Sequence, residues 1–192
     1  MTTFIAGLAL FIAMHSAQAL YPTLRAAAIA RIGVLGWKGI YSVVSLFGFV
    51  LLVQGYGDAR PESVVIWNPP VALMHASAVL NIVAFVLLAA SGVPGNAIRA
   101  RIGHPMTVGA KVWALAHLLA NGDSVSMLLF GAVLVWAVLV FRAARRRQPA
   151  PGASITTNTS ATLATVLIGV GAGIWFAFVG HAMLIGVAPF SG

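Results

Sequence analysis

The sequence predicts an all-α protein, a polytopic integral membrane helix bundle with about six transmembrane helices in a single domain over residues 1–192. Apolar residues make up 60% of the chain, charged residues only 7%, and the mean hydropathy is +0.99. A typical soluble domain carries roughly 25% charged residues, so a soluble globular protein is excluded. Because one helical crossing of a bilayer needs roughly 20 residues, six crossings fit into this length.

Polar or Pro/Gly-containing connections divide the chain into six apolar stretches, which we predict as membrane helices over residues 3–21, 37–54, 69–91, 105–122, 123–142 and 162–188. Trp37 and Trp67 stand at span ends, as interfacial anchors do. An Asn-Gly-Asp turn at 121–123 separates the fourth span from the fifth, and Asp123 can cap the helix that follows. Residues 148–161, rich in Pro, Gly, Ser and Thr, are predicted as a cytoplasmic linker before the last helix.

The distribution of charge predicts the orientation of the chain. Every Lys and Arg except Arg60 falls on one side of the predicted spans, whereas Arg60 shares the other side with Asp58, Glu62 and Asp123, the only acids. By the positive-inside rule, both termini face away from the cytoplasm. The net charge of +8 does not indicate nucleic-acid binding, because the basic residues lie between apolar runs rather than on a polar surface.

Missing residue types exclude several kinds of chemistry. The chain has no cysteine, which excludes disulfides, thiolate metal sites, a cysteine nucleophile and covalently attached heme. No acid lies within a predicted span, which argues against hydrolytic acid/base machinery inside the membrane.

Four of the five histidines, His15, His75, His117 and His181, fall inside predicted spans, where ionisable groups are costly and usually face the bundle interior. Each could simply donate to a neighbouring carbonyl, but two imidazoles on different helices can also hold a noncovalent heme b. We rank His15 and His117 first. Their predicted depths differ by roughly 10 Å at 1.5 Å per residue, so His75 or His181, nearer the level of His117, could replace His15.

The fourth span offers two further features. Around His117 lies a mostly small face that a flat macrocycle could approach or that could serve close helix packing, namely Gly109, Ala110, Trp113, Ala114, Ala120 and Asn121. Lys111, with Arg101 and His104 nearby, either snorkels to the cytoplasmic headgroups or holds an anionic group such as a propionate. On the sixth span, Gly169, Gly173, Ala177 and His181 step by four, and there helix contact is the favoured interpretation.

Several strings, taken together, resemble the NnrU family of bacterial membrane proteins and, more distantly, the zeta-carotene isomerase of plants and cyanobacteria. They run in order over about residues 4–141 and comprise His15 followed by LR at 24–25, RIG at 31–33, YSVVSLFG at 41–48, WNPP at 67–70, HPM at 104–106, KVWALAHLLANGD at 111–123, LFG at 129–131 and WA at 136–137.

This resemblance implies a bacterial inner-membrane protein with a noncovalent heme b, for which the matching ligands are His15 and His117. The isomerase pattern has a cysteine one helical turn before the second histidine, where this chain has Ala114. An exchange of cysteine and histidine ligands is therefore impossible here. The bacterial family is linked to nitrite and nitric oxide reduction in denitrification, so a redox role or a heme-dependent isomerase-like activity is expected. A quinone or another apolar molecule, and respiratory or denitrification proteins, are the expected partners.

Two other function classes stay open. The string IGHPM at 102–106, with Gly109, resembles the S-adenosylmethionine-binding region of isoprenylcysteine-type membrane methyltransferases. Those enzymes generally carry acids near the C-terminal end of the domain, and this chain has none after Asp123. The third class is a non-catalytic assembly or regulatory factor for a respiratory complex, in which the histidines are structural.

Overall fold

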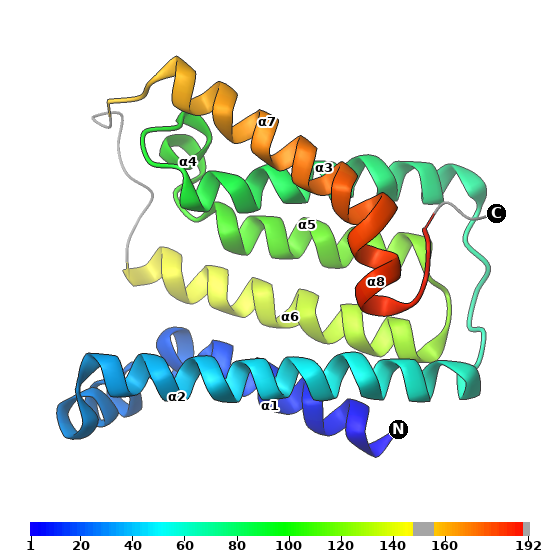
Figure 1. Ribbon diagram of the computed structural model, residues 1–192, viewed down its shortest axis with the longest axis horizontal. Helices are drawn as coiled ribbons and strands as arrows, with labels where there is room; N and C mark the ends of the chain where they lie inside the picture. The colour runs from blue at the N-terminus through cyan, green and yellow to red at the C-terminus, as the bar shows by residue number, and fades with distance from the viewer. Residues whose placement is uncertain (148–155, 190–192) are drawn as a thin grey trace. The chain divides into compact units, whose positions relative to one another are not determined.

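The computed structural model describes residues 1–147 and 156–189, and the secondary structure of these residues is helical apart from an isolated β-bridge between Val65 and Asp123. The predicted all-α class is confirmed. The chain divides into two compact units, Met1–Val64 (unit 1) and Val65–Gly192 (unit 2), whose helices are labelled in Figure 1.

Unit 1 is a pair of helices, α1 (Thr2–Leu20) and α2 (Pro22–Ala59), followed by a single 3-10 turn, η1 (Arg60–Glu62). Glycines bring the two backbones into close contact. A Cβ on Gly7 would collide with the backbone of Leu52, and one on Gly55 with the backbone of Phe4. Phe4 is completely buried in this contact. Small residues at the crossing of two apolar helices allow the backbones to pack directly, as in membrane helix pairs.

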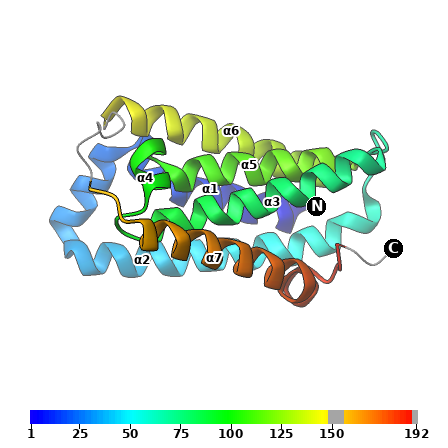
Figure 2. The ribbon, with the colours of Figure 1, turned by 90° about the horizontal axis from the view of Figure 1, so that it is seen from above.

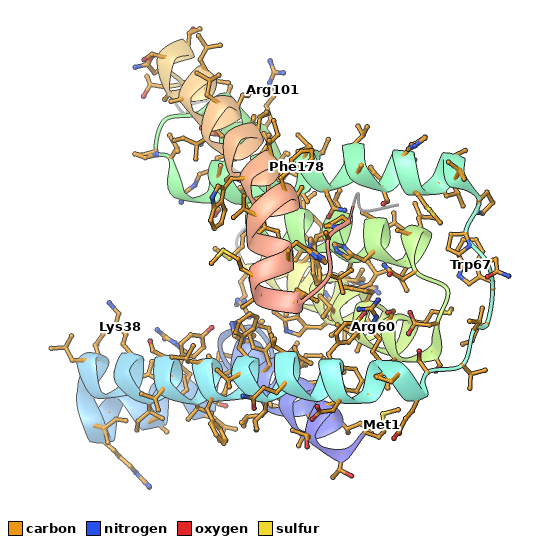
Figure 3. All side chains as sticks on the ribbon, turned by 45° about the vertical axis from the view of Figure 1, so that its right-hand side comes forward. Met1, Lys38, Arg60, Trp67, Arg101 and Phe178 are labelled. Atoms are coloured by element: carbon orange, nitrogen blue, oxygen red, sulfur yellow. The ribbon has the colours of Figure 1, made fainter. Side chains whose placement is uncertain are left out.

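Helix α2 is longer than the predicted second span. It begins at Pro22, which suits a first helical position because proline lacks the N–H that would be unbonded there. At Gly33 the backbone has φ +74°, a conformation that side chains disfavour, so this residue breaks the helix into two segments. Lys38 and Arg60 lie toward opposite ends of the second segment (Figure 3).

Unit 2 contains the remaining helices, α3 (Val71–Gly92), α4 (Ala97–Ile102), α5 (Pro105–Ala120), α6 (Ser124–Arg147), α7 (Thr159–Trp175), a π-helical turn η2 (Phe176–Gly180) and α8 (His181–Ile185). Helix α3 packs against α5 and α7, and α5 packs against α6 (Figure 2).

Glycines again mark the closest approaches in unit 2. A Cβ on Gly109 of α5 would lie 3.1 Å from the carbonyl oxygen of Ala84, and one on Gly173 of α7 would lie 2.9 Å from Ile82 Cδ1. One on Gly169 would collide with the backbone of Val86. The helix contact predicted for the small residues of the sixth span is therefore present at Gly169 and Gly173.

Hydrogen bonds hold the helix connections together at both ends of unit 2. Asn96 is buried, donates from Nδ2 to the carbonyl of Ala90 at 3.0 Å, and accepts the Arg99 N–H at 2.7 Å as the N-cap of α4. At the opposite end, the N–H groups of Ile66 and Trp67 donate to Gly122 O at 2.7 and 3.1 Å. The WNPP segment before α3 and the NGD turn between α5 and α6 are about 50 residues apart in the sequence. These backbone hydrogen bonds hold them together.

By length and apolar composition, four stretches of the described residues could cross a membrane: Pro22–Glu62, Val71–Gly92, Ser124–Arg147 and Thr159–Ile185. They contain most of the second, third, fifth and sixth predicted spans. The first and fourth predicted spans are also helices but shorter ones, because the apolar part of α1 covers Thr2–Ala17 and α5 has only 16 residues. The chain is therefore a membrane protein. Of the predicted linker 148–161, residues 148–155 lie outside the described part, and α7 begins at Thr159.

Candidate functional site

His117 lies near the C-terminal end of α5 with its ring held in one orientation. Its Nδ1 is 2.9 Å from the carbonyl oxygen of Trp113. A carbonyl only accepts, so Nδ1 carries the proton and Nε2 presents its lone pair. The ring packs against Phe130 of α6 and Trp113, with centroid separations of 4.4 and 4.6 Å. Nε2 of His117 makes no hydrogen bond to the described residues.

His15, in α1 of unit 1, has the same local arrangement. Its Nδ1 is 2.8 Å from the carbonyl oxygen of Phe11, and the Phe11 ring stacks on the imidazole with centroids 4.0 Å apart. Tyr41 of α2 covers another side, at 5.5 Å between centroids. In both histidines a carbonyl one turn earlier sets the tautomer, which is the role that a carbonyl or carboxylate partner of a metal-bound imidazole plays.

The two alternate histidines differ from each other. His181 begins α8 directly after the π-helical turn, its Nδ1 lies 2.6 Å from the carbonyl oxygen of Val187, and its ring meets Phe176 edge-on. It belongs to the same unit as His117. His75, in contrast, is exposed on α3.

A buried polar group that sequence reasoning missed lies on α3. Asn81 donates from Nδ2 to the carbonyl of Ser77 at 3.0 Å, while its buried Oδ1 has no hydrogen-bond partner among the residues that the structure describes. The contact of Gly109 with Ala84 sets the register between α5 and α3. One turn farther along, Asn81 and Trp113 lie at the same level. A lone asparagine amid apolar residues was the available signal, because an amide inside a membrane needs partners.

Two members of the small face around His117 lie in the packed interior of unit 2. Gly109 is in contact with α3, and Ala114 is completely buried. Ala114 is thus part of the packed interior rather than an open surface. Trp113 is the member of this face that contacts the His117 ring.

Two of the three basic residues predicted near the start of α5 meet around one aromatic ring of α6. Lys111 Nζ lies 3.5 Å from the centroid of Phe141, and the His104 ring meets Phe141 edge-on at 6.2 Å. Arg145, one turn after Phe141, places Cζ 5.7 Å from the same centroid. Arg101 is exposed on α4 and projects from the end of unit 2 (Figure 3).

The candidate ligands in the two units are single imidazoles rather than a cluster of ligating side chains. Among the residues that the structure describes, no group of three or more His, Cys, Asp or Glu side chains could enclose a bare metal ion. A heme iron needs only axial ligands from the protein, and neutral imidazole is one of them. In unit 2, His117 with its fixed tautomer is an imidazole of the kind that such an iron takes as a ligand.

The string HPM at 104–106 has a structural explanation in the same helix. His104 is the residue before α5, and Pro105 is its first residue, where proline is favoured. This arrangement adds no support for S-adenosylmethionine binding.

Comparison with known proteins adds one finding. No curated protein and no solved structure matches the chain. The family described as NnrU protein matches residues 3–189, which is nearly the whole chain and includes both units. This protein is therefore a membrane protein of the NnrU family.

Proposed function

We propose that this protein binds a noncovalent heme b in the bacterial inner membrane, with His117 as one axial ligand. The observation that carries the proposal is the hydrogen bond from Nδ1 of His117 to Trp113, which directs Nε2 away from the helix backbone. Both termini would face the periplasm, as the charge distribution predicts.

His15 is the proposed second ligand, and His181 is the alternate. His15 shares the tautomer that its Phe11 hydrogen bond sets, and it matches the histidine that the resemblance identifies. His181 lies in the same unit as His117. His75 is the weakest candidate, because it is exposed.

The surrounding residues would bind and shield the group. Phe130 and Trp113 would limit the rotation of the His117 ring, and the aromatic contacts of His15 would do the same in unit 1. A bound heme b supplies reversible one-electron redox chemistry.

For the biological role, we propose redox chemistry or heme-dependent isomerase-like activity on a quinone or another apolar molecule. The resemblance drawn from the sequence connects this role to nitrite and nitric oxide reduction. No described contact favours methyl transfer. In a purely structural role, His15 and His117 would make the same hydrogen bonds to the carbonyls of Phe11 and Trp113, so the spectroscopic test below separates that role from ligation.

The test is optical spectroscopy of the protein purified in detergent, with a pyridine hemochromogen assay for wild type and for His15→Ala, His117→Ala, His181→Ala and His75→Ala. We expect a b-type spectrum in wild type, its loss in His117→Ala, and its retention in His75→Ala. Loss in His15→Ala together with retention in His181→Ala selects His15 as the partner, and the reverse selects His181. Retention of an unchanged spectrum in His117→Ala would contradict the proposal.

A chemical rescue separates lost ligation from lost folding. The His117→Gly variant lacks the ring but keeps space for a free imidazole. Adding imidazole should restore the bis-histidine spectrum if His117 acts as a ligand. A correctly folded variant that imidazole leaves unchanged would assign His117 a structural role.

A further inference from the structure

Lys111, Arg145 and His104 surround the ring of Phe141 and form a cation cluster that lies apart from His117. Lys111 and Arg145 approach the Phe141 ring from α5 and from α6 itself, and the His104 ring contacts its edge. Phe130, which contacts His117, lies 11 positions before Phe141, so the two places are about 16 Å apart along α6 at 1.5 Å per residue.

No acidic side chain of unit 2 can neutralise this cluster. Asp123 is the only acid between residues 65 and 192, and it precedes α6 at the opposite end. Eighteen positions separate Asp123 from Phe141, or about 27 Å along the helix. At that end Asp123 is already engaged, because its Oδ1 accepts the N–H of Ser126 at 2.9 Å.

The hydrogen-bond donors of the two long cations have no acceptor within the part of the chain that the structure describes. The Lys111 ammonium lies over the face of Phe141, and neither it nor the Arg145 guanidinium makes a hydrogen bond there. Lysine carries three donors and arginine five, so the two side chains next to the Phe141 ring offer several hydrogen-bond donors. The ring face stabilises the ammonium while leaving those donors available.

The depth of the cluster matches the headgroup layer of a bilayer. The hydrocarbon core is about 30 Å thick, so if Asp123 lies at one boundary, a point about 27 Å along α6 lies close to the other. Helix α6 continues from there into Arg145, Arg146 and Arg147, which are exposed. Basic pockets between membrane helices at this level bind anionic lipid headgroups.

We propose that Lys111 and Arg145, arranged on Phe141 beside His104, bind the phosphate of an anionic phospholipid. Lys111 contacts the phosphate from the helix interface, and Arg145 contacts it from the exposed side. Phe141 positions both cations and borders the acyl chains. This site does not depend on heme.

The experiment measures phosphatidylglycerol retained by the detergent-purified full chain, using native mass spectrometry over a titration with phosphatidylglycerol and, separately, phosphatidylcholine. The variants are Lys111→Met, Arg145→Gln and Lys111→Arg. Arg142→Gln is the matched control, because Arg142 is an exposed cation of the same helix end and is not one of the two cations found over the Phe141 ring.

We expect preferential retention of phosphatidylglycerol and an apparent affinity about fivefold weaker in Lys111→Met and in Arg145→Gln. Arg142→Gln should stay within about twofold of wild type, and Lys111→Arg should keep most of the affinity. Equal losses in all three charge-removing variants would overturn the proposal, because unspecific surface attraction would then suffice. If Lys111→Met fails to fold, the exposed Arg145→Gln carries the test alone.

Two additional measurements distinguish a lipid phosphate from a free phosphate and from a heme propionate. Inorganic phosphate and glycerol phosphate are added as competitors, and displacement of the lipid by either at equal concentration would assign the site to a free phosphate. Heme content is measured on the same samples. We expect Lys111→Met to keep the heme content of wild type, whereas loss of heme with unchanged lipid retention would assign Lys111 to a propionate and overturn the lipid site.

Discussion

The packing of α7 against α3 can be tested by substituting two glycines of α7, Gly169 and Gly171. A Cβ on Gly169 would lie 2.8 Å from the amide nitrogen of Val86, whereas a Cβ on Gly171 meets nothing within 4 Å. Ordinary van der Waals contacts begin at 3.4 Å. To lengthen the 2.8 Å contact to that distance, Gly169→Ala must separate the helices by at least about 0.6 Å.

The two variants form a matched pair because both replace glycine by alanine inside α7. Each gains the same helix propensity, about 1 kcal/mol, so the difference between them isolates the packing penalty. Overpacking of a tight contact costs about 1–3 kcal/mol. For a chain of this size, 1 kcal/mol corresponds to a shift of about 2–4 °C in melting temperature, so Gly169→Ala should melt about 2–12 °C below Gly171→Ala.

The assay is thermal unfolding in one detergent, followed by far-ultraviolet circular dichroism and by tryptophan fluorescence. Gly171→Ala should melt at or slightly above the wild-type temperature, and Gly169→Ala clearly below Gly171→Ala. Equal melting temperatures for the two variants would refute the packing of α7 on α3, because the arrangement leaves no space for a methyl group at Gly169.

Three further predictions concern other contacts. In unit 1, Gly55→Ala should melt below Gly57→Ala, because a Cβ at Gly55 collides with the Phe4 backbone and one at Gly57 meets nothing within 4 Å; equal melting would contradict the α1–α2 crossing. Gly122→Ala should lower the melting temperature and weaken hydrogen-exchange protection of the Trp67 amide, since a Cβ there collides with the Trp67 carbonyl; unchanged exchange would argue against the bridge. Asn158→Ala removes the N-cap of α7 and should cost about 1 kcal/mol, measured as faster amide exchange confined to the first turn of that helix, and exchange as slow as in wild type would exclude the cap.

The apolar pattern predicted the helices well because hydropathy is the dominant constraint in a membrane. All six predicted spans coincide with helices over most of their length. The pattern failed where helices extend beyond the apolar core. Residues 22–32 are helical despite Arg25 and Arg31, which resembled loop charges, because alanine-rich sequence favours helix whether or not it is buried. The short α4 was also missed, since six residues carry almost no periodic signal.

The candidate site could be predicted only in part. The histidines were visible because an ionisable residue in an apolar run is conspicuous. Their hydrogen bonds to the carbonyls four positions earlier follow from helix geometry but depend on the rotamer. The unpaired oxygen of Asn81 and the meeting of Lys111 with Arg145 on Phe141 depend on packing between helices, which periodicity alone does not specify.

The central claim is that His117 is an axial ligand of a noncovalent heme b. The most direct measurement is the heme content per chain of wild type and His117→Ala, each purified from cells supplied with heme and quantified as pyridine hemochromogen. We predict about one b-type heme for each wild-type chain and almost none for a folded His117→Ala variant. A folded wild-type protein that contains no heme under these conditions would contradict the claim.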